Sequence, residues 1–99
     1  MAEVLQLHRQ EVQEVTRLDM ILLRMNALAM EMVKVNRLAK TSMPIEDIIA
    51  KARKVNGWYG LFREELAPYL SNRNVKDEYR LYVAAARNLQ RLYRTNIFV

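Results

Sequence analysis

The first part of the chain, from Ala2 to Lys40, contains neither glycine nor proline. These two residues disfavour a helix interior most strongly, so their absence predicts one long helix over residues 2–40. At about 1.5 Å per residue this helix would be roughly 58 Å long. A compact domain of about 100 residues has a radius of gyration of only about 13 Å. The helix is therefore longer than the domain that should contain it.

Apolar residues recur in this helix with a period of 3.5, which is typical of helices that pack on other helices. The remaining residues are too few to cover all sides of it, so we expect a homodimer or a higher oligomer. The predicted oligomer interface consists of Leu18, Leu22, Met25, Ala29 and Met32. Further apolar residues widen the stripe: Ile21, Leu23, Leu28, Met30 and Val33. The alternative is a break near residues 9–14, which would leave a shorter bundle.

The rest of the chain also reads as helical, which makes residues 1–99 a single all-α domain of three or four helices. We expect a second helix over residues 44–55, with Pro44 in its first turn and a stop or kink at Asn56-Gly57. A continuation over residues 58–67 would carry aromatic residues, interpreted as core rather than as a ligand cage. A third helix is predicted over residues 75–95, with Asn74 as its N-cap. The apolar tail after it either docks or frays.

Composition excludes several classes of protein. The chain is 52% hydrophobic and 27% charged, as in globular rather than disordered proteins. It has no cysteine and one histidine, His8, so we expect no disulfide, no metal site and no cofactor. The N-terminus does not resemble a signal peptide, and no uncharged run approaches the roughly 18 residues that span a membrane. We therefore expect a soluble, cytoplasmic protein.

A row of cations follows one side of the third predicted helix. The chain carries a net charge of +5, and basic residues dominate its second half. Such a row suits an anionic partner, either a nucleic acid or an acidic protein. It is equally compatible with a solvated outer face. The row consists of Lys76, Arg80, Arg87, Arg91 and Arg94.

Local enzyme motifs are absent from the sequence: there is no nucleophile elbow, no phosphate-binding loop and no metalloprotease helix. The order of elements nevertheless resembles the all-helical chorismate mutases and the related isochorismate pyruvate lyases. Residues that resemble the family's motifs are Leu18-Asp19, Leu22-Leu23, Lys40, Pro44, Asp47 and Gln90. The resemblance implies an intertwined dimer in which long first helices pair. It also implies that Lys40 and Gln90 would bind the oxygens of a small dicarboxylate.

The chain departs from this family where arginines should hold the substrate. Val12 and Ala29 stand at the two positions of the first helix, and Ala50 and Lys51 replace an Arg-Glu pair in the second. Our first hypothesis is therefore a non-enzymatic helical assembly or partner-binding module. The alternatives are a chorismate-mutase-like enzyme with an altered site, and nucleic-acid binding through Arg80, Arg87, Arg91 and Arg94.

Overall fold

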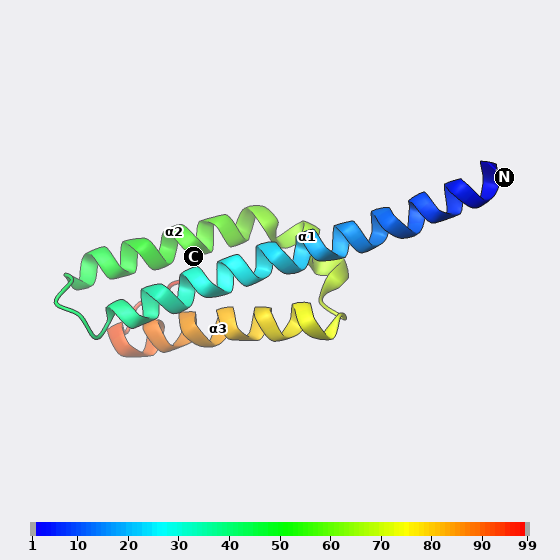
Figure 1. Cartoon of the computed structure of the whole chain (residues 1–99). Helices are drawn as coiled ribbons and strands as arrows, with labels where there is room; N and C mark the ends of the chain where they lie inside the picture. Colours follow the sequence, from blue (N-terminus) through cyan, green and yellow to red (C-terminus); the bar gives the residue numbers. More distant parts are fainter. Residues whose placement is uncertain (1, 99) are drawn as a thin grey trace.

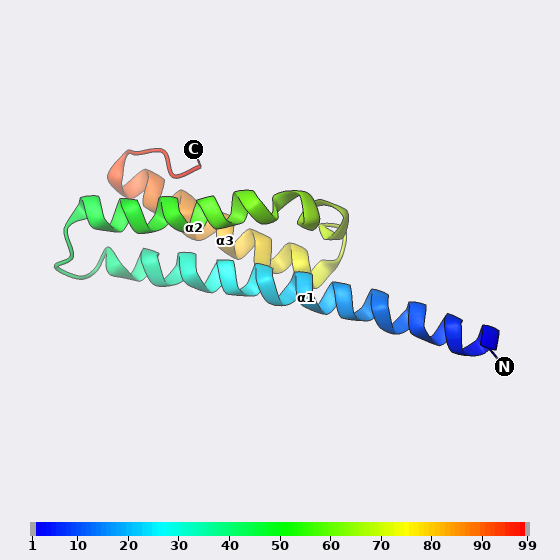
Figure 2. The same cartoon turned by 90° about the horizontal axis from the view of Figure 1, so that it is seen from above.

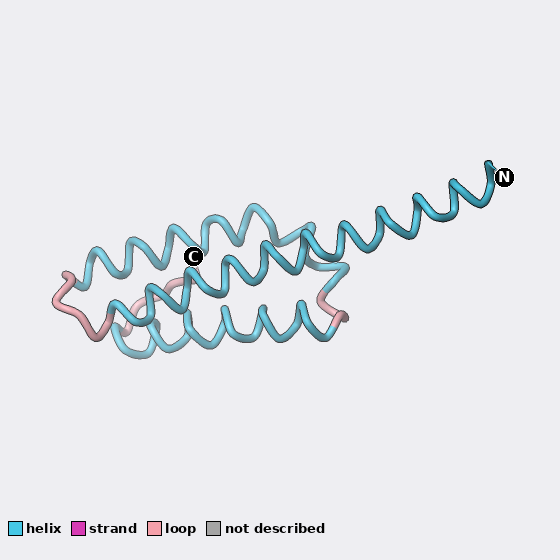
Figure 3. The backbone as a smooth tube through the Cα atoms, viewed as in Figure 1, coloured by secondary structure: helices cyan, strands magenta, loops and turns pink. Residues whose placement is uncertain are grey.

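The computed structural model describes the backbone of residues 2–98 and the side chains of residues 16–98. Over residues 2–98 the chain forms three α-helices and no strand, which confirms the all-α prediction. The elements are α1 (Ala2–Leu38), α2 (Ile45–Leu66), the short 3-10 helix η1 (Ala67–Tyr69) and α3 (Arg73–Tyr93). Loops are confined to the two connections and the C-terminal tail (Figure 3).

The first helix is continuous from Ala2 to Leu38, so the structure does not contain the break considered near residues 9–14. Its N-terminal turns project past η1 and the start of α3, as Figures 1 and 2 show from two directions. The molecule measures 63 × 20 × 19 Å along its principal axes. Its radius of gyration is 17.2 Å, above the value of about 13 Å for a compact domain of this size.

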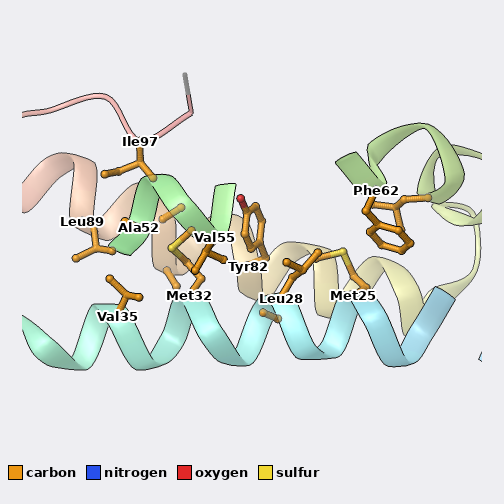
Figure 4. Packing of buried hydrophobic residues seen from close by; sticks show 14 of the residues in the cluster. Met25, Leu28, Met32, Val35, Ala52, Val55, Phe62, Tyr82, Leu89 and Ile97 are labelled. Atoms are coloured by element: carbon orange, nitrogen blue, oxygen red, sulfur yellow. The ribbon is translucent and has the colours of Figure 1, made fainter. Parts of the chain in front are cut away.

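α1 forms the centre of the bundle, because α2 and α3 both pack on it and approach each other at few positions. One hydrophobic core runs along this junction (Figure 4). Its side chains are Ile21, Met25, Leu28, Ala29, Met32 and Val35 from α1, Ile48, Ala52, Val55, Phe62 and Leu66 from α2, Val75, Tyr82, Ala85, Ala86 and Leu89 from α3, and Ile97 from the tail.

The second helix passes through Asn56-Gly57 without a break, so the stop expected near Val55 was wrong. A glycine in a helix interior costs about 1 kcal/mol relative to alanine. Burying a side chain such as Val55 or Phe62 contributes about 1.5–3 kcal/mol each. Both lie on the inner side of α2, and their burial outweighs the local cost of Gly57.

The third helix begins two residues earlier than the sequence suggested. Its N-cap is Asn72, whose side-chain oxygen accepts hydrogen bonds from the backbone N–H groups of Asn74 (3.0 Å) and Val75 (3.2 Å). The prediction of Asn74 as N-cap was therefore wrong, because a residue of the same type two positions earlier caps the helix. At the other end Arg94 takes a left-handed conformation (φ 49°), which ends α3 and turns the chain back.

The C-terminal tail docks rather than frays, and Ile97 is fully buried. The side-chain oxygen of Gln90 accepts hydrogen bonds from the backbone N–H groups of Ile97 (2.7 Å) and Phe98 (3.2 Å). The guanidinium of Arg53 donates to the carbonyl of Asn96 at 3.3 Å. One residue from α2 and one from α3 thus hold the tail.

We predict that Ile97→Ala lowers the free energy of unfolding by about 2–4 kcal/mol, because it removes buried methyl groups and leaves a cavity. The matched control is Leu92→Ala, since Leu92 is 56% exposed and its truncation should cost less than about 0.5 kcal/mol. Urea unfolding followed by circular dichroism, at one protein concentration, measures both. Equal losses in the two variants would contradict a docked tail.

Candidate functional site

The residues predicted to form the oligomer interface lie on the side of α1 that faces its own chain. Met25, Ala29 and Met32 are fully buried in the core. Leu18 and Leu22 are half-buried and pack against the same core. In this conformation the five side chains are inner-face residues, so a surface open to a partner has to be sought elsewhere on the helix.

The opposite side of α1 carries a second apolar row, here called the outer stripe: Met20, Leu23, Ala27 and Met30. Met20 is 50% exposed, Leu23 70% and Met30 41%. Their steps of three, four and three residues place them along one side of the helix. The sequence contains this signal, but its heptad pattern assigns Leu23 and Met30 only to the margin of the inner stripe.

A shallow depression between α1 and α2 adjoins the outer stripe. It is lined by Arg24, Ala27 and Leu28 from α1 and by Trp58, Leu61 and Phe62 from α2. Leu61 is 85% exposed and Trp58 45%. The apolar surface therefore continues from the outer stripe onto α2.

Arg24 crosses the edge of this surface toward α2. Its guanidinium makes an ion pair with Glu65 at 3.0 Å and lies 5.9 Å from the centroid of the Phe62 ring. Both charged side chains are more than half exposed. The pair therefore contributes little stability, but it neutralises a charge beside the outer stripe.

The cationic row on α3 is exposed along its whole length. None of the five side chains makes an ion pair with another described side chain. Arg87 and Arg91 flank a shallow depression around Ala84 that also includes Gln90. The row Lys76, Arg80, Arg87, Arg91 and Arg94 is thus accessible to an anionic partner.

The two residues implied by the chorismate mutase resemblance lie toward the same end of the bundle, where α1 and α3 both end (Figure 1). Lys40 is exposed in the turn after α1. Gln90 uses its side-chain oxygen to hold the backbone of the tail. Ala29 is buried in the core, and Val12 lies outside the described side chains. The structure therefore gives Gln90 a structural contact that the sequence did not suggest.

Tyrosine rings from α2 and α3 lie against one another. The ring of Tyr59 stacks on that of Tyr82, with centroids 4.9 Å apart, and lies 6.2 Å from Tyr79. The Tyr82 hydroxyl donates a hydrogen bond to the side-chain oxygen of Asn56 at 2.9 Å. Burial raises the pKa of Tyr82 strongly, and it also raises the pKa of Tyr59. The core interpretation of the aromatic residues over 58–67 therefore holds only in part: Phe62 is buried and Tyr59 is half-buried, but Trp58 is 45% exposed because it lies on the outer side of α2.

Acidic residues line another depression, between α1 and α3. Asp19, Asp77 and Glu78 contribute to it, and one buried carboxylate oxygen of Glu78 has no hydrogen-bond partner. Among the residues that the structure describes, no group of three acidic or histidine side chains has the geometry to hold a metal ion. Over the same part of the chain, no helix is both long and apolar enough to cross a membrane.

We predict that the free energy of unfolding falls as the pH rises above about 10. Unfolded tyrosine loses its proton near pH 10, whereas folded Tyr82 keeps it, so the unfolded state binds fewer protons in this range. Urea unfolding between about pH 9 and pH 11 measures the loss. Tyr82→Phe should make the decline shallower, and a variant that declines as steeply as the original chain would contradict the assignment.

Comparison with known proteins identifies no relative of this chain. A scan against protein-family models, a search of curated proteins and a search of solved structures each found no match to the chain.

Proposed function

We propose that this chain is a self-associating helical module in which a second copy packs on the outer side of α1. The observation that carries the proposal is the outer stripe, whose three large side chains are 41–70% exposed. A helix side that faces only water is normally polar. A contiguous apolar row at helical spacing on such a side is typical of a binding surface.

The spacing of the outer stripe supports a helix as the occupant. Steps of three and four residues are the heptad pattern in which side chains of one helix fit between those of another. The neighbouring Trp58 and Leu61 on α2 extend the apolar area beyond a single helix width. The occupant would therefore contact both α1 and α2.

The shape of the molecule gives independent support. α1 continues beyond the bundle, so α2 and α3 leave its first turns without cover from the chain's own helices (Figures 1 and 2). Isolated helical segments shorter than about 12–15 residues are marginal in water. In an assembly of two copies, the helices of the second copy would pack beside this long helix and stabilise it.

We predict that Leu23→Glu converts the assembly into monomers, because a charge at the most exposed large residue of the outer stripe would have to be desolvated on association. Light scattering across a dilution series measures the molar mass. Leu92→Glu is the matched control: Leu92 lies on α3 and is 56% exposed, so this variant should keep the mass of the original chain.

A wild-type chain that is monomeric at all concentrations would overturn the proposal. So would an assembly whose mass Leu23→Glu leaves unchanged. Circular dichroism of both variants verifies that neither has unfolded.

A second candidate function, nucleic-acid binding, is favoured by one specific observation. Four cations on α3, together with Arg94 directly after it, are exposed and make no ion pair among the described side chains. A line of unpaired cations can follow phosphates and release their counterions. An acidic protein is the other anionic partner that such a row suits.

We predict that the triple variant Arg87→Gln, Arg91→Gln, Arg94→Gln lowers affinity for duplex DNA or RNA and flattens its dependence on salt. On a DNA duplex, the slope of log affinity against log salt should fall by about 0.9 for each phosphate that the variant no longer neutralises. Fluorescence anisotropy with a labelled oligonucleotide measures both quantities, and Lys34→Gln on α1 serves as the control. An unchanged slope in the triple variant would argue against binding through this row.

The enzyme alternative stays a prediction based on resemblance alone. It requires Lys40 and Gln90 to bind a small dicarboxylate, and Gln90 would then have to exchange its contacts with the tail for contacts with substrate. We place it below self-association, because alanines stand at Ala29 and Ala50 where that family supplies charged residues.

A further inference from the structure

The outer stripe has the same spacing in both chain directions. Its steps of three, four and three residues are symmetric about a point between Leu23 and Ala27, at the level of Met25. A two-fold axis at this level brings an identical row into contact with the first. We propose that two copies pair their α1 helices antiparallel, with Leu23 of each copy against Ala27 of the other. This inference rests on the self-association proposed above.

Side-chain size favours this direction. In the antiparallel pair the large Leu23 packs against the small Ala27, and Met20 packs against Met30 at both ends. Methionine is flexible and adapts to irregular gaps. In a parallel pair without offset, Leu23 would meet Leu23 and Ala27 would meet Ala27, which leaves a gap at the alanine layer. Unfilled volume of this kind destabilises an interface as it does a core.

The charged residues that flank the outer stripe also favour the antiparallel pair. In heptad terms, Arg17 and Glu31 occupy equivalent positions beside the stripe on the side of α2, so an antiparallel pair places Arg17 of each copy beside Glu31 of the other. The ion pair that Glu31 makes within its own chain is weak, since it joins Lys34 at 3.4 Å and the two side chains are 45% and 66% exposed. Arg24 would approach Arg24 of the second copy, and its ion pair with Glu65 at 3.0 Å offsets that repulsion.

The exposed apolar patch on α2, which consists of Trp58 and Leu61, lies at the level of the proposed two-fold axis. Trp58 and Leu61 share a depression with Ala27 and Leu28, which are within three residues of Met25 along α1. The axis therefore brings the two copies of this depression close together. Association in this register covers Leu61, which is 85% exposed in the single chain. The apolar patch on α2 and the symmetry of the outer stripe thus point to the same register.

Disulfide cross-linking tests the register, because the chain contains no cysteine of its own. Leu23→Cys and Ala27→Cys are prepared separately, oxidised alone and as an equimolar mixture, and resolved on non-reducing gels. Bridged cysteines need Cα atoms about 4.4–6.8 Å apart. We expect several-fold more cross-linked dimer in the mixture than in either variant alone.

A second measurement avoids substitutions within the stripe. Arg17→Glu and Glu31→Arg should each weaken association alone, because each creates two like-charge contacts across the axis. An equimolar mixture of the two variants should associate more tightly than either one, since both contacts are then between opposite charges. Sedimentation velocity over a concentration series measures this difference.

The outcomes separate this inference from the proposed function. A wild-type chain that is monomeric would overturn the proposed function, self-association, together with this inference. A wild-type dimer in which Leu23→Cys cross-links efficiently with itself would show a parallel pair, and would overturn only the register. A wild-type dimer with no preference for the mixture in either experiment would place the contact at another register or face, and would likewise overturn the inference.

Discussion

Burial against α1 is the interaction on which the rest of the bundle depends. α2 and α3 each pack along it but contact each other only sparsely. Core side chains from all three helices therefore meet at α1, and Met25, Ala29 and Met32 are fully buried there. An arrangement in which two helices share a third leaves one side of the third uncovered. The outer stripe lies on that side, so the same packing that forms the core also exposes the proposed interface.

Because α2 and α3 contact each other only sparsely, other side chains have to connect them. Tyrosines and the C-terminal tail make this connection. Tyr59 and Tyr82 stack in the space between the helices, and the hydrogen bond from Tyr82 to Asn56 satisfies the buried hydroxyl. Ile97 fills the core beyond them, held by Arg53 and Gln90. Contacts between residues that are far apart in the sequence thus connect α2 to α3.

The sequence was most informative where one regular pattern extended over many residues. The absence of glycine and proline over residues 2–40 predicted the long first helix, which the structure contains as α1 (Ala2–Leu38). Local signals failed where tertiary packing opposed them. Gly57 is a plausible helix end taken alone, but the burial of residues on both sides keeps α2 continuous.

The inner and outer sides of α1 could not be distinguished from spacing. The inner residues Leu22, Met25 and Ala29 satisfy a heptad pattern, and so do the outer residues Met20, Leu23 and Ala27. Only the positions of α2 and α3 decide which row faces the core. The role of Gln90 was hidden for a related reason, since its contact with the tail requires the left-handed turn at Arg94.

The two proposed surfaces differ in the physical interaction that each would use, and salt separates them. Two copies with a net charge of +5 repel each other at long range, but at physiological ionic strength this repulsion is screened beyond about 8 Å. Association through the mainly apolar outer stripe should therefore persist or strengthen as salt is added. Binding of phosphates to the arginines of α3 releases counterions and weakens under the same conditions. A chain that used both surfaces would stay assembled at a salt concentration that releases its anionic partner, because only the second interaction is carried mainly by charge.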